Sequence, residues 1–355
     1  MTQILKVDKY CSEIDILEHL KDDCINLVVA PTGSGKSTVA LNLSMTELNV
    51  AFCAPFLSIT QQVKLNYPHL DISTGTKAQE EECLADGRIT SFHSAPRLLE
   101  LKNIDILIID EIHYLVNYAG FSYGAVGRLW ETVDQLKEKH PHMKIVALTG
   151  TPHFIRKASF LDFNLIVINQ KYPTSKPEEI FVSRSWTREY AKDNSFIALY
   201  PSRKLGKIWA KKHNGTYLDS AIKASSKTYQ AILEGKLISK KIFTSTILST
   251  GISILDKVDI LYTNWLSLTD IVQFSSRPRQ GGHLLKVTQT PKPFFLRNGC
   301  EKPTLNWTNN YESNFQLLNK YEQWASFAYH QDESDLFTII YQMLWAPQQE
   351  LPEPY

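Results

Sequence analysis

The stretch Ala30-Pro-Thr-Gly-Ser-Gly-Lys-Ser-Thr38 follows an apolar run at residues 27–29 and precedes a helical pattern that starts at Val39. Glycines in such a turn let successive backbone N–H groups converge on phosphate oxygens at a helix N-terminus. The lysine supplies a cation near the β and γ phosphates, and the hydroxyl that follows it can bind Mg²⁺. The alternative is a glycine-rich turn that binds no nucleotide. We predict a nucleotide-binding loop made of Thr32, Gly33, Ser34, Gly35, Lys36, Ser37 and Thr38.

The length and composition of the chain indicate a cytoplasmic protein of more than one domain. Its 355 residues exceed the size at which a single core usually divides, and a hydrophobic fraction of 43% can fill real cores. No window approaches the roughly 18 uninterrupted apolar residues that a membrane span needs. The N-terminus lacks the pattern of a secretory signal, and the five cysteines show no paired spacing. We therefore expect reduced thiols and no membrane partner.

Charge is unevenly distributed along the chain, although the formal net charge is only +1. Residues 201–250 contain ten Lys and Arg against two acids, whereas residues 311–355 contain seven acids against one Lys. This asymmetry indicates a basic patch for a polyanion and an acidic terminal segment. Five of the bases belong to a predicted helix with Leu205, Ile208 and Trp209 on its apolar side. The alternative for each charged segment is an ordinary solvated surface.

Apolar runs alternate with helical patterns in both halves of the chain, which indicates parallel sheets covered by helices. The predicted strands are 26–30, 50–54, 88–92, 104–109, 144–148, 195–200, 241–245, 258–263 and 284–288. Turn and breaker residues at 170–177 mark the boundary between two α/β units. The predicted domains are residues 1–168, residues 177–298 and a C-terminal extension, 299–355, with helices at 309–329 and 334–345 and an acidic tail. We expect this extension to pack on the second unit or to begin a further, truncated part.

Two carboxylates follow a buried strand at Asp110-Glu-Ile-His113. The carboxyl edge of a parallel sheet is where open α/β folds bind ligands, so this position favours a chemical role. Asp110 can hold Mg²⁺ opposite Ser37, and Glu111 can accept the proton of an attacking water. The alternative is an acidic pair that only caps the following helix.

Three segments together resemble motifs I, II and III of superfamily 2 DExH helicases: the loop at 30–38, the box at 110–113 and Thr149-Gly-Thr-Pro152. The loop begins with Ala30 in place of the usual Gly, a variant that is common in this superfamily. The resemblance extends over roughly residues 15–290. It implies ATP and Mg²⁺ as ligands, with Lys36 at the phosphates and Ser37 and Asp110 as metal ligands. It also implies that His113, Thr149 and Thr151 couple ATP hydrolysis to nucleic-acid binding.

Further segments resemble the motifs with which this family contacts nucleic-acid backbone. Residues 54–61 and 73–76 resemble motifs Ia and Ib, and residues 197–202 and 243–251 resemble motifs IV and V. Backbone contacts of this kind fix register without reading sequence. The resemblance implies nucleic-acid contacts from Pro55, Gln61, Thr74, Gly75, Thr76, Ser202, Thr244 and Thr250, and a nucleotide contact from Gly251.

The segment Gln273-Phe-Ser-Ser-Arg-Pro-Arg279 resembles motif VI but departs from its common form, Q-x-x-G-R-x-G-R. It is similar to the shorter Q-x-x-G-R-x-R of the herpesvirus origin-binding helicases and related phage or plasmid replication helicases. The resemblance implies a catalytic role for Gln273, and makes Arg277 and Arg279 candidate arginine fingers that neutralise charge at the γ-phosphate. The alternative is that these side chains bond other protein groups only.

The resemblance implies an α/β fold of two tandem RecA-like P-loop domains and a short helical C-terminal segment. It implies an ATP-dependent helicase or translocase that acts as a monomer, with a protein partner at the C-terminal segment. The motif VI pattern favours DNA over RNA and a role in replication or recombination, in the cytoplasm or, for a viral protein, in the host cytoplasm or nucleus. An RNA helicase and a double-strand translocase or ATP-dependent switch remain alternatives. A non-catalytic module is disfavoured by the intact Lys36, Asp110 and Glu111.

Two other groups of residues favour structural roles. Phe92, Trp265 and Phe274 could stack on bases, but core packing is the stronger expectation. His140 and His142 are the one close histidine pair and have no nearby cysteine, so we expect no histidine-bound metal.

Overall fold

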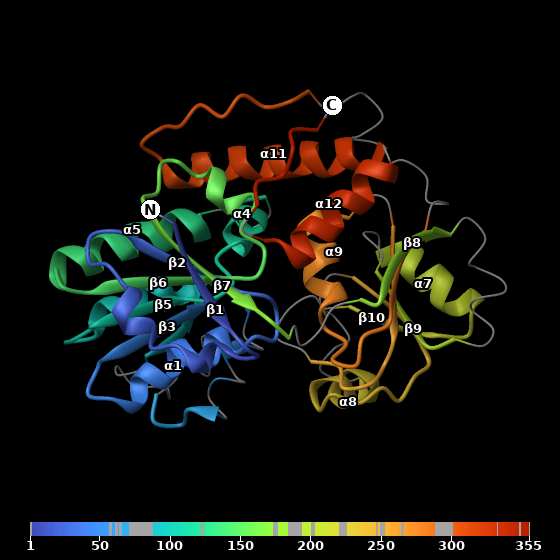
Figure 1. Cartoon of the computed structure of the whole chain (residues 1–355), viewed down its shortest axis with the longest axis horizontal. Helices are drawn as coiled ribbons and strands as arrows, with labels where there is room; N and C mark the ends of the chain where they lie inside the picture. The colour runs from blue at the N-terminus through green and yellow to red at the C-terminus, as the bar shows by residue number, and fades with distance from the viewer. Residues whose placement is uncertain are drawn as a thin grey trace. The chain divides into compact units, whose positions relative to one another are not determined.

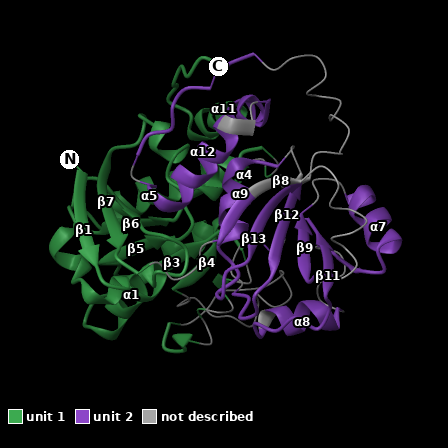
Figure 2. Ribbon diagram, turned by 45° about the vertical axis from the view of Figure 1, so that its right-hand side comes forward, with its two compact units in different colours: residues 1–173, 303–321 green, residues 174–302, 322–355 purple. Residues whose placement is uncertain are grey.

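The computed structural model describes residues 2–56, 59–60, 63, 66–70, 88–120, 122, 124–172, 177–183, 194–199, 203–219, 226–245, 248, 253–263, 266–287, 301–331, 333–347 and 349–354. The chain divides into two compact units (Figure 2), which are Met1–Pro173 with Pro303–Tyr321 and Thr174–Lys302 with Glu322–Tyr355. Each unit contains one parallel sheet flanked by helices (Figure 1). The α/β fold class predicted from the sequence is confirmed.

The sheet of the first unit has seven strands in the order β1-β7-β2-β6-β5-β3-β4, and each described pair is parallel. Its central strands are continuous apolar runs, as expected where helices cover both faces of a parallel sheet. The strands are β1 (Thr2–Val7), β2 (Ile25–Val29), β3 (Val50–Ala54), β4 (Ile89–Ser91), β5 (Ile106–Ile109), β6 (Lys144–Thr149) and β7 (Phe163–Gln170).

Alternate residues of these strands point into two separate apolar cores. One core joins Leu27 and Ile109 to η4 (Phe92–Glu100), α4 (Tyr114–Tyr118) and α5 (Ala125–Lys139). The other core joins the opposite side of the same strands to three shorter elements. These are η2 (Ile16–His19), α1 (Lys36–Asn42) and η3 (Leu43–Met45).

The sheet of the second unit has six strands in the order β10-β11-β9-β12-β13-β8, again with parallel pairs. The strands are β8 (Glu179–Ser183), β9 (Phe196–Leu199), β10 (Thr216–Leu218), β11 (Lys241–Thr244), β12 (Asp259–Thr263) and β13 (His283–Val287). The helices are α7 (Arg203–Lys212), α8 (Lys227–Leu233) and α9 (Leu268–Ser275), together with α12 (Glu333–Trp345), which contacts α9 and β8. No helix within the described residues is long and apolar enough to span a bilayer.

The helix α7 covers one face of this sheet with a narrower apolar side than we predicted. Ala210 is buried in a core with Phe196 and Phe243, and Leu205 and Trp209 pack against it. Ile208, which we placed on the apolar side, is 50% exposed. The prediction for Ile208 is therefore wrong, because the small Gly206 and Ala210 take the positions that face the sheet.

All nine predicted strands are present, and four further strands were not predicted. Three of them, β1, β10 and β8, lie at sheet edges. Edge strands are short and expose one side to water, so they lack the continuous apolar run that marks a central strand. The fourth, β7, ends at Gln170, where the breaker residues that marked our domain boundary begin.

Both helices predicted in the C-terminal segment are confirmed, as α11 (Tyr311–Gln331) and α12. Residues 303–321 belong to the first unit, where the buried Phe315 stacks on Trp130 with ring centroids 6.1 Å apart. Of the two alternatives for this extension, packing of the whole segment on the second unit is therefore wrong. Glu322–Tyr355 does belong to the second unit. The predicted domain boundaries remain predictions.

The helix α12 contributes buried side chains to its unit, and this gives a stability prediction. Ile340 is fully buried, so Ile340→Ala leaves a cavity and is expected to lower the free energy of unfolding by about 2–5 kcal/mol. Thr338→Ala on the exposed side of the same helix should change it by less than about 0.5 kcal/mol. Chemical denaturation of both variants measures the difference, and equal stabilities would show that α12 is only an appendage.

Candidate active site

Three predicted motifs follow three neighbouring strands of the first unit. The glycine-rich loop follows β2, Thr149 ends β6, and Asp110 follows β5, and these strands are adjacent in the order β2-β6-β5. Because the carboxyl ends of parallel strands share one edge, the motifs meet there. Backbone bonds join them: the Ala30 N–H donates to the Thr149 carbonyl at 3.2 Å, and the Ile112 N–H to the Leu148 carbonyl at 3.0 Å.

The glycine-rich loop has the backbone conformation that its sequence predicts. Gly33 and Gly35 have φ angles of 82° and 84°, in the left-handed region that other residues rarely adopt. A Cβ added to Gly35 would meet no atom within 4 Å, so the backbone angle rather than space requires glycine there. Gly35 is the N-cap of α1, and its carbonyl accepts the Val39 N–H at 2.9 Å. Lys36 begins the helix and is 5% exposed.

The two predicted Mg²⁺ ligands are in direct contact. The Ser37 hydroxyl donates to Asp110 Oδ2 at 3.0 Å, and the Glu111 N–H donates to Asp110 Oδ1 at 2.9 Å. Asp110 is 4% exposed. Burial and the charge of Glu111 raise the pKa of Asp110 to about 6, although Lys36 and Ser37 oppose the shift. A cation beside this carboxylate would favour its ionised form.

Glu111, the predicted base, has a strained backbone. Its φ is 49°, and such a conformation costs a residue other than glycine about 1–3 kcal/mol. Its side chain is buried, with Oε2 lying 3.6 Å from His113 Nδ1. Strain of this kind is typical of functional sites, where the surrounding structure holds a side chain in one position.

The three residues predicted to couple the two activities form one hydrogen-bonded network. His113 Nδ1 and Thr149 Oγ1 are hydrogen-bonded at 2.9 Å, and Thr149 Oγ1 accepts the Thr151 N–H at 3.0 Å. All three residues are buried. The network thus joins the acidic box to the segment after β6, while the coupling role itself remains a prediction.

In the second unit, the motif VI residues have two different sets of partners. Arg277 is 4% exposed, and its Nη2 donates to Gln273 Oε1 at 3.1 Å. Gln273 lies on α9 and is fully buried. Arg279 is half-buried, and its Nε and Nη2 donate to Ser253 Oγ at 3.2 and 2.6 Å. The structure therefore pairs Gln273 with Arg277 and holds Arg279 separately.

Two predicted nucleic-acid contacts lie within the described residues, and both are buried. The Pro55 carbonyl accepts a hydrogen bond from the Tyr118 hydroxyl, and the Thr244 hydroxyl donates to the Ser245 carbonyl at 3.0 Å. The other predicted contacts lie outside the described residues: Gln61, Thr74, Gly75, Thr76, Ser202, Thr250 and Gly251. Among the aromatic candidates, Phe92 and Phe274 are fully buried, which confirms core packing, and Trp265 lies outside the described residues.

The basic side chains of α7 are exposed, and Lys207 and Lys212 are among those with local partners. Lys207 Nζ lies 4.0 Å from Asp219 Oδ2, and Lys212 Nζ lies 4.6 Å from the ring centre of Trp209. Exposed bases of this kind fit both a phosphate track and a solvated surface.

Among the described residues, no group of three His, Cys, Asp or Glu is placed to hold a metal ion. The Asp110 carboxylate and the Ser37 hydroxyl together suit Mg²⁺, which usually completes its coordination shell with water and phosphate.

Sequence reasoning missed the contact of Cys11 with the glycine-rich loop. The Cys11 N–H donates to the Ser34 carbonyl at 2.8 Å, and its thiol donates to Ser34 Oγ at 3.4 Å. Burial raises the pKa of the Cys11 thiol, so it stays protonated and can donate. The two residues are 23 positions apart with no intervening pattern, so no sequence signal pairs them.

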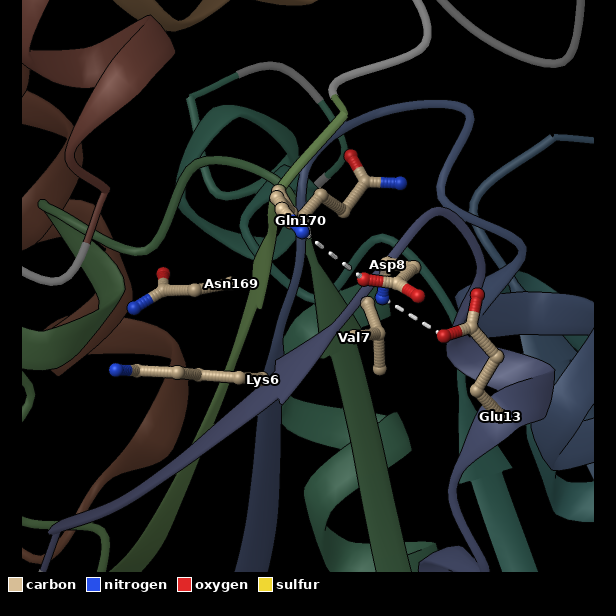
Figure 3. A pocket seen from close by; sticks show the side chains of 7 residues that line it. Lys6, Val7, Asp8, Glu13, Asn169 and Gln170 are labelled. Atoms are coloured by element: carbon tan, nitrogen blue, oxygen red, sulfur yellow. Dashed lines mark hydrogen bonds and ion pairs between the residues drawn. The ribbon is translucent and has the colours of Figure 1, made fainter.

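An open pocket of about 670 Å³ lies beside the carboxyl ends of β1 and β7 (Figure 3). The Glu13 carboxylate on its wall accepts the N–H groups of Asp8, Lys9 and Tyr10 at 2.7–2.9 Å, and these bonds lower its pKa. None of the predicted site residues lines this pocket. Its lining residues are Lys6, Val7, Asp8, Glu13, Asn169, Gln170 and Lys171.

Comparison with protein families matches residues 2–154 to the family described as "Type III restriction enzyme, res subunit". The matched region contains the glycine-rich loop, the acidic box and Thr149–Thr151, all within the first unit. Comparison with curated proteins gives no match.

Several solved structures share the fold at low sequence identity. The Mycobacterium smegmatis helicase Lhr, bound to ssDNA and AMP-PNP, has a TM-score of 0.58 and 14% identity over 79% of this chain and 46% of its own. The DUF1998 helicase MrfA, bound to DNA, has a TM-score of 0.56 and 15% identity over 79% of this chain and 49% of its own. Dbp5 of S. cerevisiae, bound to RNA and ADP BeF3, has a TM-score of 0.56 and 15% identity over 95% of this chain and 94% of its own. The chain thus shares the RecA-like α/β fold of these helicases and spans about half the length of the first two.

Proposed function

We propose that this chain is an ATP-hydrolysing nucleic-acid helicase or translocase of superfamily 2. The observation that carries the proposal is the 3.0 Å bond between Ser37 of the phosphate loop and Asp110 of the acidic box, beside the buried Glu111. A glycine-rich turn without a nucleotide has no need of a carboxylate pair at this point. The family match to residues 2–154 and the shared fold support the same assignment.

The residues present fit ATP and Mg²⁺. Two left-handed glycines shape a loop whose N–H groups suit phosphate oxygens, and Lys36 supplies the cation. Ser37 and Asp110 would hold Mg²⁺, which would neutralise phosphate charge. Mg²⁺ would also stabilise the ionised form of Asp110, which burial disfavours, as the raised pKa of this carboxyl indicates.

In the proposed reaction, each residue of the chain has one task. Lys36 binds the β and γ phosphates, and Glu111 takes the proton from the attacking water. The strained backbone of Glu111 and the nearby His113 would hold the carboxylate in one orientation. Arg277 or Arg279 of the second unit would neutralise the charge that develops at the γ-phosphate, and Gln273 would orient Arg277 through their hydrogen bond.

The nucleic-acid partner is proposed from the same resemblance. The nucleic-acid contacts predicted from motifs Ia, Ib, IV and V and the exposed bases of α7 would contact the sugar-phosphate backbone. The Q-x-x-S-R-x-R pattern at 273–279 favours DNA and a role in replication or recombination, with the protein acting as a monomer in the cytoplasm or in an infected host cell. The solved structures with this fold include complexes with DNA and with RNA, so they support a nucleic-acid partner without selecting one.

A second candidate is a double-strand translocase that does not separate strands. The match of the first unit to the res subunit of type III restriction enzymes favours this alternative, since restriction motors are translocases of that kind. The alternative uses the same ATP site and differs in the nucleic acid that stimulates it.

One experiment tests the proposal and separates its branches. The ATPase rate is measured with single-stranded DNA, duplex DNA and single-stranded RNA, with Glu111→Gln as the inactive control. We expect single-stranded DNA to stimulate most. Stimulation by duplex DNA alone would favour the translocase, and stimulation by RNA alone an RNA helicase. Absence of ATP hydrolysis under all three conditions would contradict the proposal.

The salt dependence of the same assay tests the role of α7. Phosphate contacts release counterions, so nucleic-acid affinity should fall steeply with salt although the protein is almost neutral. Replacing Lys207, Lys211 and Lys212 by Gln should flatten that dependence if α7 borders the track. An unchanged slope would leave α7 as a solvated surface.

A further inference from the structure

Three polar side chains four residues apart form a buried stripe on one face of α11. They are Glu322, Ser326 and His330, and they are 2%, 4% and 5% exposed. Residues spaced by four positions lie above one another on a helix, so the stripe faces one neighbour. All three belong to the second unit, in the C-terminal extension that the sequence predicted to be helical.

Each member of this α11 stripe bonds the segment that enters α9. Ser326 Oγ accepts the N–H of Leu268, the first residue of α9, at 3.2 Å. His330 Nε2 donates to the Leu266 carbonyl at 3.1 Å, and the Glu322 carboxyl hydrogen-bonds Ser267 and Thr269. The first N–H groups of a helix have no partner within it, so α11 satisfies groups that α9 cannot.

The helix that is held in this way carries motif VI. Gln273 is fully buried on α9, and the Arg277 N–H donates to the Phe274 carbonyl at 3.0 Å just beyond its end. Arg277 in turn donates to Gln273 at 3.1 Å. The position of the Gln273–Arg277 pair therefore depends on where α9 begins.

Two carboxyls face the single hydroxyl of Ser267 at the start of α9. The Ser267 hydroxyl donates to Asp270 Oδ2 at 3.0 Å, and the Glu322 carboxyl is its other acidic neighbour. Burial raises the pKa of Glu322 to about 8, above the value of about 6 for Asp270, which makes Glu322 the carboxyl that holds a proton at neutral pH.

Other titratable or charged groups also face the stripe. Burial lowers the pKa of His330 to about 3, so this ring is neutral and keeps its proton on Nε2. Lys286 of β13 donates to the His330 carbonyl at 3.4 Å. Asp270 of α9 is the acid that faces Glu322. Ionisation of Glu322 would place a second negative charge beside Asp270 at the start of α9.

We propose that the α11 stripe is a positioning device that holds α9, and through it Gln273 and Arg277, in the arrangement that ATP hydrolysis requires. The inference rests on the proposed function. Its residues belong to the second unit and the glycine-rich loop to the first, so the stripe should act on turnover and leave ATP binding by the first unit unchanged.

The test compares Ser326→Ala and Glu322→Ala with Gln323→Ala, an exposed neighbour on the same helix. Loss of a buried hydrogen bond at the start of α9 should lower kcat by about tenfold and leave KM for ATP within about twofold. Glu322→Gln keeps a donor and an acceptor, so its turnover at pH 7 should stay close to wild type. Turnover of both alanine variants equal to that of Gln323→Ala overturns the proposal.

The pH profile provides a readout that a purely structural role would not change. Wild-type turnover should fall above pH about 8, where Glu322 ionises, and the fall should be absent in Glu322→Gln. A native state that holds this proton also loses stability as pH rises from 4.5 to about 8, because the unfolded chain has released it, and Glu322→Gln should lack that loss. An alkaline fall that survives in Glu322→Gln contradicts the proposal.

Amide exchange of residues 266–277 separates this inference from the proposed function. We expect faster exchange there in Ser326→Ala and Glu322→Ala than in Gln323→Ala, whether or not the wild type hydrolyses ATP. Faster exchange with no wild-type ATPase activity refutes the proposed function but retains the contact to α9. Unchanged exchange in a folded Ser326→Ala protein overturns the positioning role.

Discussion

Glu111→Gln should lower the rate of ATP hydrolysis by about 10²–10⁴-fold and leave ATP binding intact. The substitution removes the proton acceptor but keeps the size of the side chain, whose Oε2 lies 3.6 Å from His113. The measurements are single-turnover hydrolysis and equilibrium binding of a nucleotide analogue. Glu131→Gln, an exposed acid on α5, is the matched control and should behave as wild type.

Lys36→Ala, by contrast, should abolish nucleotide binding itself. Lys36 is 5% exposed at the start of α1, and it is the proposed phosphate cation of the glycine-rich loop. Hydrolysis near the wild-type rate by Glu111→Gln would show that another group is the base. Normal nucleotide binding by Lys36→Ala would remove the glycine-rich loop from the proposed ATP site.

At least one of Arg277→Ala and Arg279→Ala should lower kcat by about 10³-fold, with a much smaller effect on ATP affinity, if arginine fingers act here as in other phosphate-loop enzymes. The two variants probe different environments, because Arg277 bonds Gln273 and Arg279 bonds Ser253. Lys236→Ala removes a base that is 73% exposed in the same unit and serves as the control.

The pattern of the two losses identifies the finger. If Arg277 is the finger, Gln273→Ala should also lower kcat, since Gln273 Oε1 accepts from Arg277 Nη2. If Arg279 is the finger, Ser253→Ala should do so instead. Full activity of both arginine variants would remove the second unit from the chemistry.

The sequence by itself determined the fold class and the central strands. Buried strands of a parallel sheet are apolar on both faces, so β2, β3 and β5 appear as continuous apolar runs that local pattern alone reveals. The glycine-rich loop and the acidic box were also visible, because glycines at a tight turn and carboxylates directly after an apolar strand are local patterns of the sequence. Edge strands such as β1 were missed for the converse reason, since one exposed side interrupts the apolar run.

Only the tertiary structure decided which distant residues meet. The bond of Cys11 to Ser34 joins residues far apart in sequence, and no local pattern specifies it. Ser37 was expected opposite Asp110 and His113 was grouped with Thr149, but the direct bonds within these two pairs appear only in the folded chain. The acidic C-terminal segment shows the limit most clearly. Its charge indicated an acidic terminal segment and left a solvated surface open as the alternative, yet Glu322 is buried against the start of α9. Charged residues enter a core only when particular partners satisfy them, and those partners are known only once the chain is folded.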